Sequence, residues 1–293
     1  MRIFAPAVAA IAAVAGVPAA ASSPVSGAVG NGLIVFSKKR HGNVDLYTAT
    51  AAGKHLRRLT RAPGQDLYAA WSPDGTRIAY TYYFRSRYSV WITTPTRSRP
   101  RRLTPPGVAA FDPSWSPDGT HLVVGVETPD GADDIEVLDV ATGALTNVTN
   151  APGDDLDPAW SPDGAHIAFA SDRDNPDANV YDIYVTTPDG TTQTRLTATA
   201  DSDDGLPAWS PDGSRLSYVS AVGNNLRVVV MNADGSGAAF LAAGTEPAWS
   251  PDGTRIVFAH NRQLLVMNSD GTGLHRIMKT GSADGAPDWQ PLR

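Results

Sequence analysis

Six acidic residues recur at a similar place in six successive segments of this sequence, and they are its best candidates for binding chemistry. Each lies shortly before a tryptophan that ends a short segment: Asp66, Asp112, Asp157, Asp204, Glu246 and Asp284. If the segments surround a common axis, the carboxylates form a ring that can bind a cation or the basic group of a partner. The alternative is structural, because aspartate side chains commonly accept hydrogen bonds from nearby backbone N–H groups. Both roles stay open.

The residue types that other chemistries need are absent or scattered. The chain has no cysteine, which excludes disulfides, thiol nucleophiles and zinc–thiolate sites. It has no Gly-x-Ser-x-Gly motif, the nucleophile elbow of α/β-hydrolases. His121 and His166 occupy a repeat position that elsewhere carries arginine, so no histidine cluster is expected. We therefore predict no catalytic residue, no cofactor and no metal site, with a channel-bound Ca²⁺ ion as an open alternative.

Charge is distributed unevenly along the chain. Residues 22–110 contain 14 Lys and Arg and 3 Asp and Glu, whereas residues 111–293 contain 9 and 27. Such asymmetry can steer a partner whose own charges are separated. Much of the basic excess falls in expected loops, and we predict a basic rim beside the acidic ring: Lys38, Lys39, Arg40, Arg85 and Arg87. A nucleic-acid partner is not expected, because the net charge is −6 and no nucleic-acid-binding module is recognisable.

These residues are positioned by an internal repeat. The pentapeptide WSPDG recurs at 71–75, 115–119, 160–164, 209–213 and 249–253, and 289–291 is a degenerate sixth copy. The tryptophans are 44, 45, 49, 40 and 40 residues apart. Short apolar runs bounded by Gly, Pro, Asp and Ser fill each unit, which indicates strands. A repeat of about 40–50 residues built from several strands is typical of propeller blades.

The two ends of the repeat complete each other. The strand that follows the pentapeptide occurs six times, first at 33–36 and last at 255–258. The first copy has no tryptophan segment before it, and the last tryptophan segment, at 287–289, has no such strand after it. We predict an all-β, six-bladed β-propeller of four-stranded antiparallel blades, closed by a C-terminal strand that pairs into the N-terminal blade. Closure removes the exposed edges of an open sheet.

The Pro-x-Trp-Ser-Pro-Asp-Gly units, each followed by an apolar strand, resemble the WD-like repeats of the TolB family over residues 31–293. The resemblance implies a six-bladed propeller and, for TolB itself, periplasmic binding of protein partners at the central opening. TolB carries an α/β domain before its propeller, whereas here we expect only a leader of about ten residues between the cleavage site and the first blade. A role in the Tol–Pal system is therefore left open. Related repeats also occur in oligogalacturonate lyases, which keeps an enzymatic alternative.

The first residues are typical of a secretory signal peptide. Arg2 precedes an alanine-rich apolar run that ends in small residues. We predict a signal peptide at 1–21, a flexible leader at 22–31 and the propeller at 32–293. An uncleaved membrane anchor is the alternative for the first segment. Cleavage would leave a protein without stable membrane insertion, located in the periplasm or outside the cell.

Together these features predict an exported, non-enzymatic binding or scaffold protein, monomeric, that recognises a peptide or protein at the channel mouth. The partner would be an envelope or cell-wall component. The alternative is a secreted carbohydrate-active or other hydrolase or lyase with its site in the central channel. Propeller active sites are assembled from several blades, so the absence of a local catalytic motif does not decide between the two.

Overall fold

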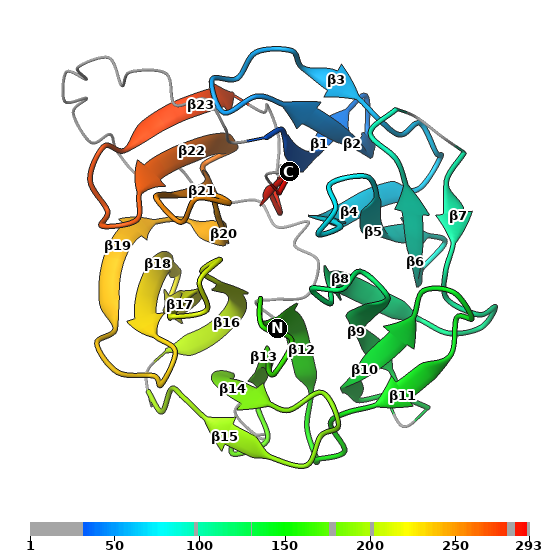
Figure 1. The fold of residues 1–293 in the computed structure, drawn as a ribbon, viewed down its shortest axis with the longest axis vertical. Coiled ribbons are helices and arrows are strands. Elements are labelled where there is room, and N and C mark those ends of the chain that lie inside the picture. The colour runs from blue at the N-terminus through cyan, green and yellow to red at the C-terminus, as the bar shows by residue number, and fades with distance from the viewer. Residues whose placement is uncertain are drawn as a thin grey trace.

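The computed structural model describes residues 32–96, 99–129, 131–175, 180–199, 202–279 and 285–291. Its strands form six four-stranded antiparallel sheets arranged as blades around a central axis (Figure 1). This confirms the predicted six-bladed propeller. The predicted signal peptide and leader lie outside the described residues, so their assignment stays a prediction.

The first three blades, given from the innermost strand outward, contain the N-terminal half of the chain. Blade 1 contains β24 (Asp288–Trp289), β1 (Ile34–Arg40), β2 (Asn43–Ala49) and β3 (Arg57–Arg58). Blade 2 contains β4 (Gln65–Trp71), β5 (Ile78–Phe84), β6 (Arg87–Thr93) and β7 (Arg101–Arg102). Blade 3 contains β8 (Ala110–Trp115), β9 (His121–Glu127), β10 (Asp133–Asp139) and β11 (Leu145–Asn147).

The other three blades follow in chain order. Blade 4 contains β12 (Asp155–Trp160), β13 (Ile167–Ser171), β14 (Asp182–Thr186) and β15 (Gln193–Arg195). Blade 5 contains β16 (Asp203–Trp209), β17 (Arg215–Val222), β18 (Asn225–Asn232) and β19 (Ala239–Ala243). Blade 6 contains β20 (Thr245–Trp249), β21 (Arg255–His260), β22 (Gln263–Asn268) and β23 (His275–Lys279). The strands alternate in direction, so one face carries the hairpins between second and third strands and the entry to each inner strand.

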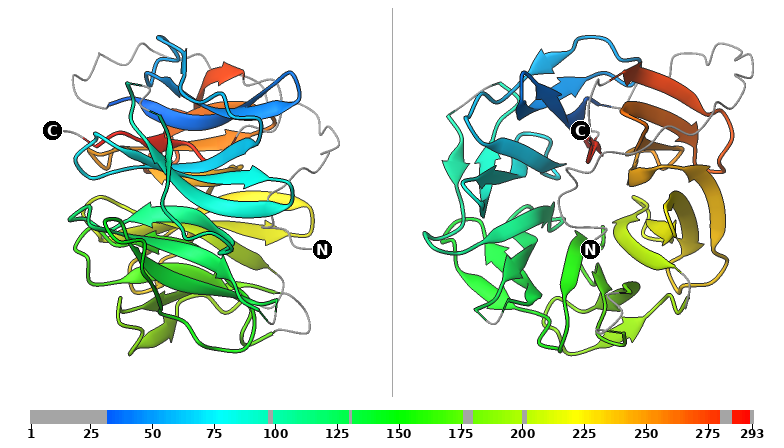
Figure 2. Two further views of the ribbon diagram at one scale, coloured as in Figure 1. Left: turned by 90° about the vertical axis from the view of Figure 1, so that its right-hand side faces the viewer. Right: turned by 180° about the vertical axis from the view of Figure 1, so that it is seen from behind.

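Blade 1 is completed by both ends of the chain, as the repeat predicted. Strand β24 pairs with β1 in the register Ile34↔Trp289 and Val35↔Asp288. The backbone N–H of Gln290 also donates to the carbonyl of Leu33 at 2.8 Å. The two views of Figure 2 show the blades stacked around the axis, with the red C-terminal strand inside the blue N-terminal ones.

The hydrophobic core lies between neighbouring blades. One cluster joins Val35 and Leu46 of blade 1 to Trp71 and Ile78 of blade 2. At several of these seams the indole N–H of a repeat tryptophan donates to the carbonyl before the preceding blade's tryptophan. The bonds are Trp115 to Ala70 at 3.1 Å, Trp209 to Ala159 at 3.1 Å and Trp249 to Ala208 at 3.2 Å. The repeat tryptophan therefore ties two blades together as well as filling the space between them.

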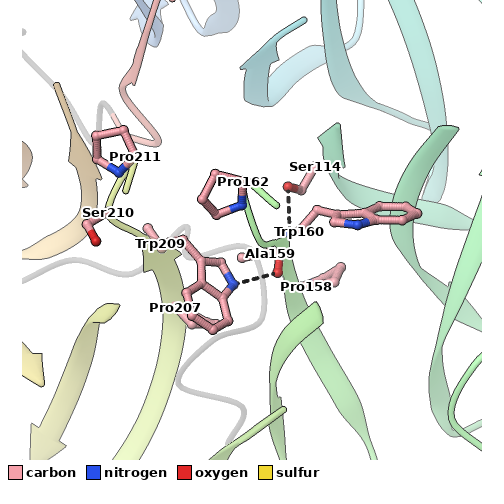
Figure 3. A pocket seen from close by; sticks show the side chains of 10 residues that line it. Ser114, Pro158, Ala159, Trp160, Pro162, Pro207, Trp209, Ser210 and Pro211 are labelled. Carbon is pink, nitrogen blue, oxygen red and sulfur yellow. Dashed lines mark hydrogen bonds between the residues drawn. The ribbon is translucent and has the colours of Figure 1, made fainter. Parts of the chain in front are cut away.

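Trp160 departs from this arrangement. Its indole N–H donates to the carbonyl of Gly164 in its own turn, at 3.3 Å, and its backbone N–H donates to the hydroxyl of Ser114 at 3.1 Å. Figure 3 shows Trp160 and Trp209 on either side of a hollow of about 280 Å³ that prolines also line. The seam between blades 3 and 4 thus lacks the indole bond that the seam between blades 4 and 5 has.

Removing residues 287–293 is expected to destroy cooperative folding, because it deletes the inner strand of blade 1 and uncovers β1. Chemical denaturation, followed by tryptophan fluorescence and light scattering, would show a broadened transition or aggregation. A truncated chain that unfolds at the same denaturant concentration as the full chain, with the same slope, would contradict ring closure by β24.

The different bonding of the tryptophans predicts unequal costs for the same substitution. Trp115→Phe removes a bond across a seam and is expected to lower the free energy of unfolding by about 1–3 kcal/mol. Trp160→Phe removes only a bond within one turn and is expected to cost less than about 1 kcal/mol. Urea denaturation of both variants gives the comparison. Equal losses would mean that the indole bonds across the seams do not stabilise the ring.

Candidate binding site in the central channel

The innermost strands are bulged at one repeated position. Three residues before each repeat tryptophan, the backbone adopts a left-handed conformation, with φ between 48° and 55°, at Tyr68, Asp112, Asp157, Leu206, Glu246 and Ala286. The pairing register with the second strand shifts at the same point in blades 2 to 6. Proline follows in five of the six copies. Proline cannot donate to a ladder, so a bulged strand bordering the channel is a place where it can be accommodated. We call these six residues the channel ring.

The channel ring encloses a cavity of about 160 Å³. The ring residues line it together with the prolines that follow them and with Asp288 from β24. Of the six acidic residues predicted from the sequence, Asp112, Asp157 and Glu246 border this cavity. Tyr68, Leu206, Ala286 and Asp288 were not predicted. The constant spacing of three residues before tryptophan, applied strictly, would have indicated the first three of them.

Two other predicted residues occupy a different register, five positions before tryptophan. Asp66 and Asp204 are buried within the blades, and Asp204 accepts a hydrogen bond from the hydroxyl of Thr199 at 3.0 Å. Asp284 shares this spacing but lies outside the described residues. The structure therefore divides the predicted ring into three carboxylates at the channel and two within the blade walls. The binding role of the channel members stays a prediction.

Two of the channel carboxylates also connect neighbouring blades. Asp157 Oδ2 accepts the backbone N–H of Leu206 at 3.1 Å, and Glu246 Oε2 accepts that of Ala286 at 2.6 Å. Asp288 Oδ2 accepts the backbone N–H of Trp71 at 2.7 Å. In each contact the donor belongs to the next blade. The structural alternative, in which the acidic side chains accept backbone N–H groups, therefore applies to Asp157 and Glu246, whose donors belong to the next blade.

Asp112 is bonded differently. Its carboxyl group interacts with that of Asp157, and its Oδ1 atom has no hydrogen-bond partner among the described residues. Burial and the charges of Asp157 and Glu246 raise the pKa of Asp112 far above its usual range. Burial also raises the pKa of Asp157. Burial and the charges of Asp112, Glu246 and Asp157 raise the pKa of the Tyr68 hydroxyl. The clustered carboxyl groups therefore favour a bound proton or another positive group in the channel.

The predicted basic residues lie on the face that carries the hairpins between second and third strands. Lys38, Lys39 and Arg40 end β1, Arg85 lies in the β5–β6 turn, and Arg87 begins β6. Apart from the half-buried Lys38, these side chains are exposed. Their placement beside the entry to the inner strands agrees with a basic rim, although binding by that rim is untested.

Metal ligation and membrane insertion find no support within the part of the chain that the structure describes. No three His, Asp or Glu side chains there are arranged to hold a metal ion. Among the same residues, no helix has the length and apolar character to cross a bilayer. Asp157, Glu246 and Asp288 accept backbone N–H groups.

A ring of six four-stranded blades around a carboxylate-lined channel defines a β-propeller with a candidate binding site on its axis. The chain belongs to the family described as the TolB beta propeller domain, whose model matches residues 69–259. A protein TolB homolog from Chlorobium luteolum is 34% identical over 163 residues, which are 55% of this chain and 35% of that protein. The chain therefore spans about a third of the length of this curated relative.

Solved structures show the same fold. TolB from Acinetobacter baumannii superposes with a TM-score of 0.78 at 23% identity, over 89% of this chain and 67% of that one. A putative TolB from Agrobacterium tumefaciens superposes with a TM-score of 0.68 at 19% identity, over 90% of this chain and 100% of that one. An oligogalacturonate lyase in complex with manganese superposes with a TM-score of 0.61 at 16% identity, over 85% of this chain and 74% of that one. At these identities the likeness concerns the fold alone.

The buried carboxylates predict that the protein loses stability as the pH rises from about 4 to 7. Burial raises the pKa of both Asp66 and Asp288 to about 7, above the unfolded value of 3.8. Their stabilising contribution is complete below the unfolded pKa and is lost as the pH rises through the folded pKa. Each proton released costs about 1.4 kcal/mol per pH unit within that window.

The measurement is the free energy of unfolding at several pH values between 4 and 8. Asp66→Asn removes one of the titrating groups and is expected to flatten the decline. An exposed carboxylate variant, Asp270→Asn, is the control and should leave the slope unchanged. A stability that rises from pH 4 to pH 8 in the parent protein would contradict the raised pKa values.

Proposed function

We propose that this chain is an exported, non-enzymatic binding module that holds a segment of a protein partner at the channel mouth. The observation that carries the proposal is the cavity on the axis, where the carboxyl groups of Asp112, Asp157 and Asp288 converge and no Lys or Arg is among the described lining residues. A lysine, arginine or terminal ammonium group on a partner supplies the missing positive charge. Family membership supports the same kind of function.

Export is part of the proposal and rests on the signal-like first 21 residues. It places the partner in the cell envelope or outside the cell. The lyase alternative receives support only from a shared fold, which does not determine activity. The channel wall offers carboxylates and one tyrosine, and no histidine is among its described residues.

A photo-crosslinking amino acid at position 68 tests this proposal directly, because Tyr68 lines the cavity. The same amino acid at Phe240 is the control, since that side chain is 59% exposed on the outer strand β19 of blade 5. Irradiation of cells producing each variant should give a protein adduct from position 68 and none from position 240. Mass spectrometry then identifies the partner.

The proposal also predicts how the adduct responds to charge. Replacing Asp112 and Asp157 by Asn and Glu246 by Gln in the Tyr68 crosslinking variant should reduce adduct formation about tenfold or more. An adduct of unchanged yield in the neutral channel, or adducts from position 240 alone, would show that the channel is not the binding site.

A further inference from the structure

The hairpins between second and third strands, which share one face, differ in length. In blades 5, 6, 1 and 2 they have two-residue turns, at 223–224, 261–262, 41–42 and 85–86. In blades 3 and 4 more residues separate the corresponding strands, which end and begin at Glu127 and Asp133 and at Ser171 and Asp182. The length of this connection therefore distinguishes blades 3 and 4 from the other four.

The short turns contain residues that their backbone does not favour. Arg85 and Ser86 have φ of 51° and 60°, and Asn261 and Arg262 have φ of 48° and 61°. Both central residues of such a turn are left-handed, and Asn-Gly is the preferred pair because it meets the least steric resistance. Arg85 and Arg262 therefore occupy left-handed positions that disfavour arginine. Strained backbone that persists in a fold is a reason to look for a functional role.

The short hairpins of blades 6, 1 and 2 share a positive charge. Exposed basic side chains occur on or beside each of them, and we call this set the basic arc: Lys39, Arg40, His41, Arg85, Arg87 and Arg262. The guanidinium group of Arg85 also lies 5.1 Å from the ring centre of Phe84, a phenylalanine with 37% of its surface exposed. The arc therefore offers cations next to an apolar contact.

The opposite half of the same face is acidic. Blades 3 and 4 present Glu127 and Asp174 as exposed residues, with Asp133, Asp134 and Asp172 buried just behind them. Some of this charge is balanced, since Asp155 pairs with Arg173 at 2.8 Å and Asp174 with Arg195 at 2.8 Å. The channel carboxylates lie between the two halves and add to the negative side.

We propose that the basic arc binds the acidic part of a protein segment whose cationic group occupies the channel, so that the partner is held in one orientation. This inference rests on the function proposed above and adds the chemistry of the partner. A uniformly anionic polymer is attracted to the arc but repelled by the channel and by blades 3 and 4. A polypeptide with clustered Asp or Glu followed by Lys or Arg satisfies both regions at once.

Synthetic peptides of equal length and composition provide the probe. One carries four Glu residues, a Gly-Ser spacer and four Lys residues, and its isomer alternates Glu with Lys. Surface plasmon resonance is measured at 50 mM and 500 mM salt. The segregated peptide should associate about tenfold faster than its isomer at 50 mM, and salt should remove most of the difference, because screening acts on such steering.

Matched variants locate the effect. Arg40→Gln, Arg85→Gln and Arg87→Gln together should abolish the preference for the segregated peptide. Arg57→Gln, Arg99→Gln and Arg276→Gln remove the same charge from exposed positions elsewhere and should preserve it. If both triple variants lose the preference for the segregated peptide to the same extent, the preference depends on net charge and not on the arc, and the inference is overturned.

The remaining outcomes separate this inference from the proposed function. If the neutral-channel variant loses the Tyr68 adduct while the arc variant shows unchanged association, the channel binds and the arc does not. If heparin binds the arc more tightly than the segregated peptide does at equal salt, the arc is a polyanion site and the orientation proposed here is overturned. Loss of the preference in the arc variant, with the Tyr68 adduct still formed, supports the inference.

Discussion

The structure depends on a left-handed residue three positions before the repeat tryptophan of each blade, which forms a bulge in the innermost strand of blades 2 to 6. This residue, followed by proline in five of the six copies, lines the channel in every blade. The same bulge frees a backbone N–H, which in three copies finds its acceptor in the preceding blade: Thr81 for Asp112, Asp157 for Leu206 and Glu246 for Ala286. One local distortion thus forms the channel wall and connects the blades.

This arrangement gives the channel carboxylates two roles that compete. Asp157 and Glu246 lie close enough to the axis to accept a neighbour's N–H, and with Asp112 they are within electrostatic reach of one another. Their mutual repulsion raises the pKa of Asp112, so protonation of that carboxyl group reduces the repulsion. Blade 2 avoids the conflict, because Tyr68 occupies its ring position and the hydroxyl of Thr81 accepts the bond instead.

The fold could be predicted from the sequence because it follows from the repeat. Six tryptophan segments and six following strands determine the number of blades and require Trp289 to join the first of them. The site could be predicted only in part, because acidic residues occur at both three and five positions before tryptophan and only the first register borders the cavity. A left-handed backbone at Tyr68, Leu206 or Ala286 has no signature in residue type. Trp160 turns its indole N–H to Gly164 and its backbone N–H to Ser114 of the neighbouring blade, which no pattern along the chain reveals.

Architecture and recognition are therefore carried by different residues of the same repeat. Tryptophan, proline and the aspartate of the WSPDG turn serve packing and turn geometry. The serine hydroxyl of that turn donates to the aspartate in each of five copies, and the aspartate pKa falls to about 2 in three of them. The ring position and the hairpin tips vary from blade to blade, and at the ring position Asp157 and Glu246 also accept N–H groups across a seam. Substitution at the hairpin tips therefore changes the surface offered to a partner without removing a bond between blades, whereas substitution of Asp157 or Glu246 changes both. In this chain the left-handed arginines of the tips are exposed and fill no seam, so packing does not explain them.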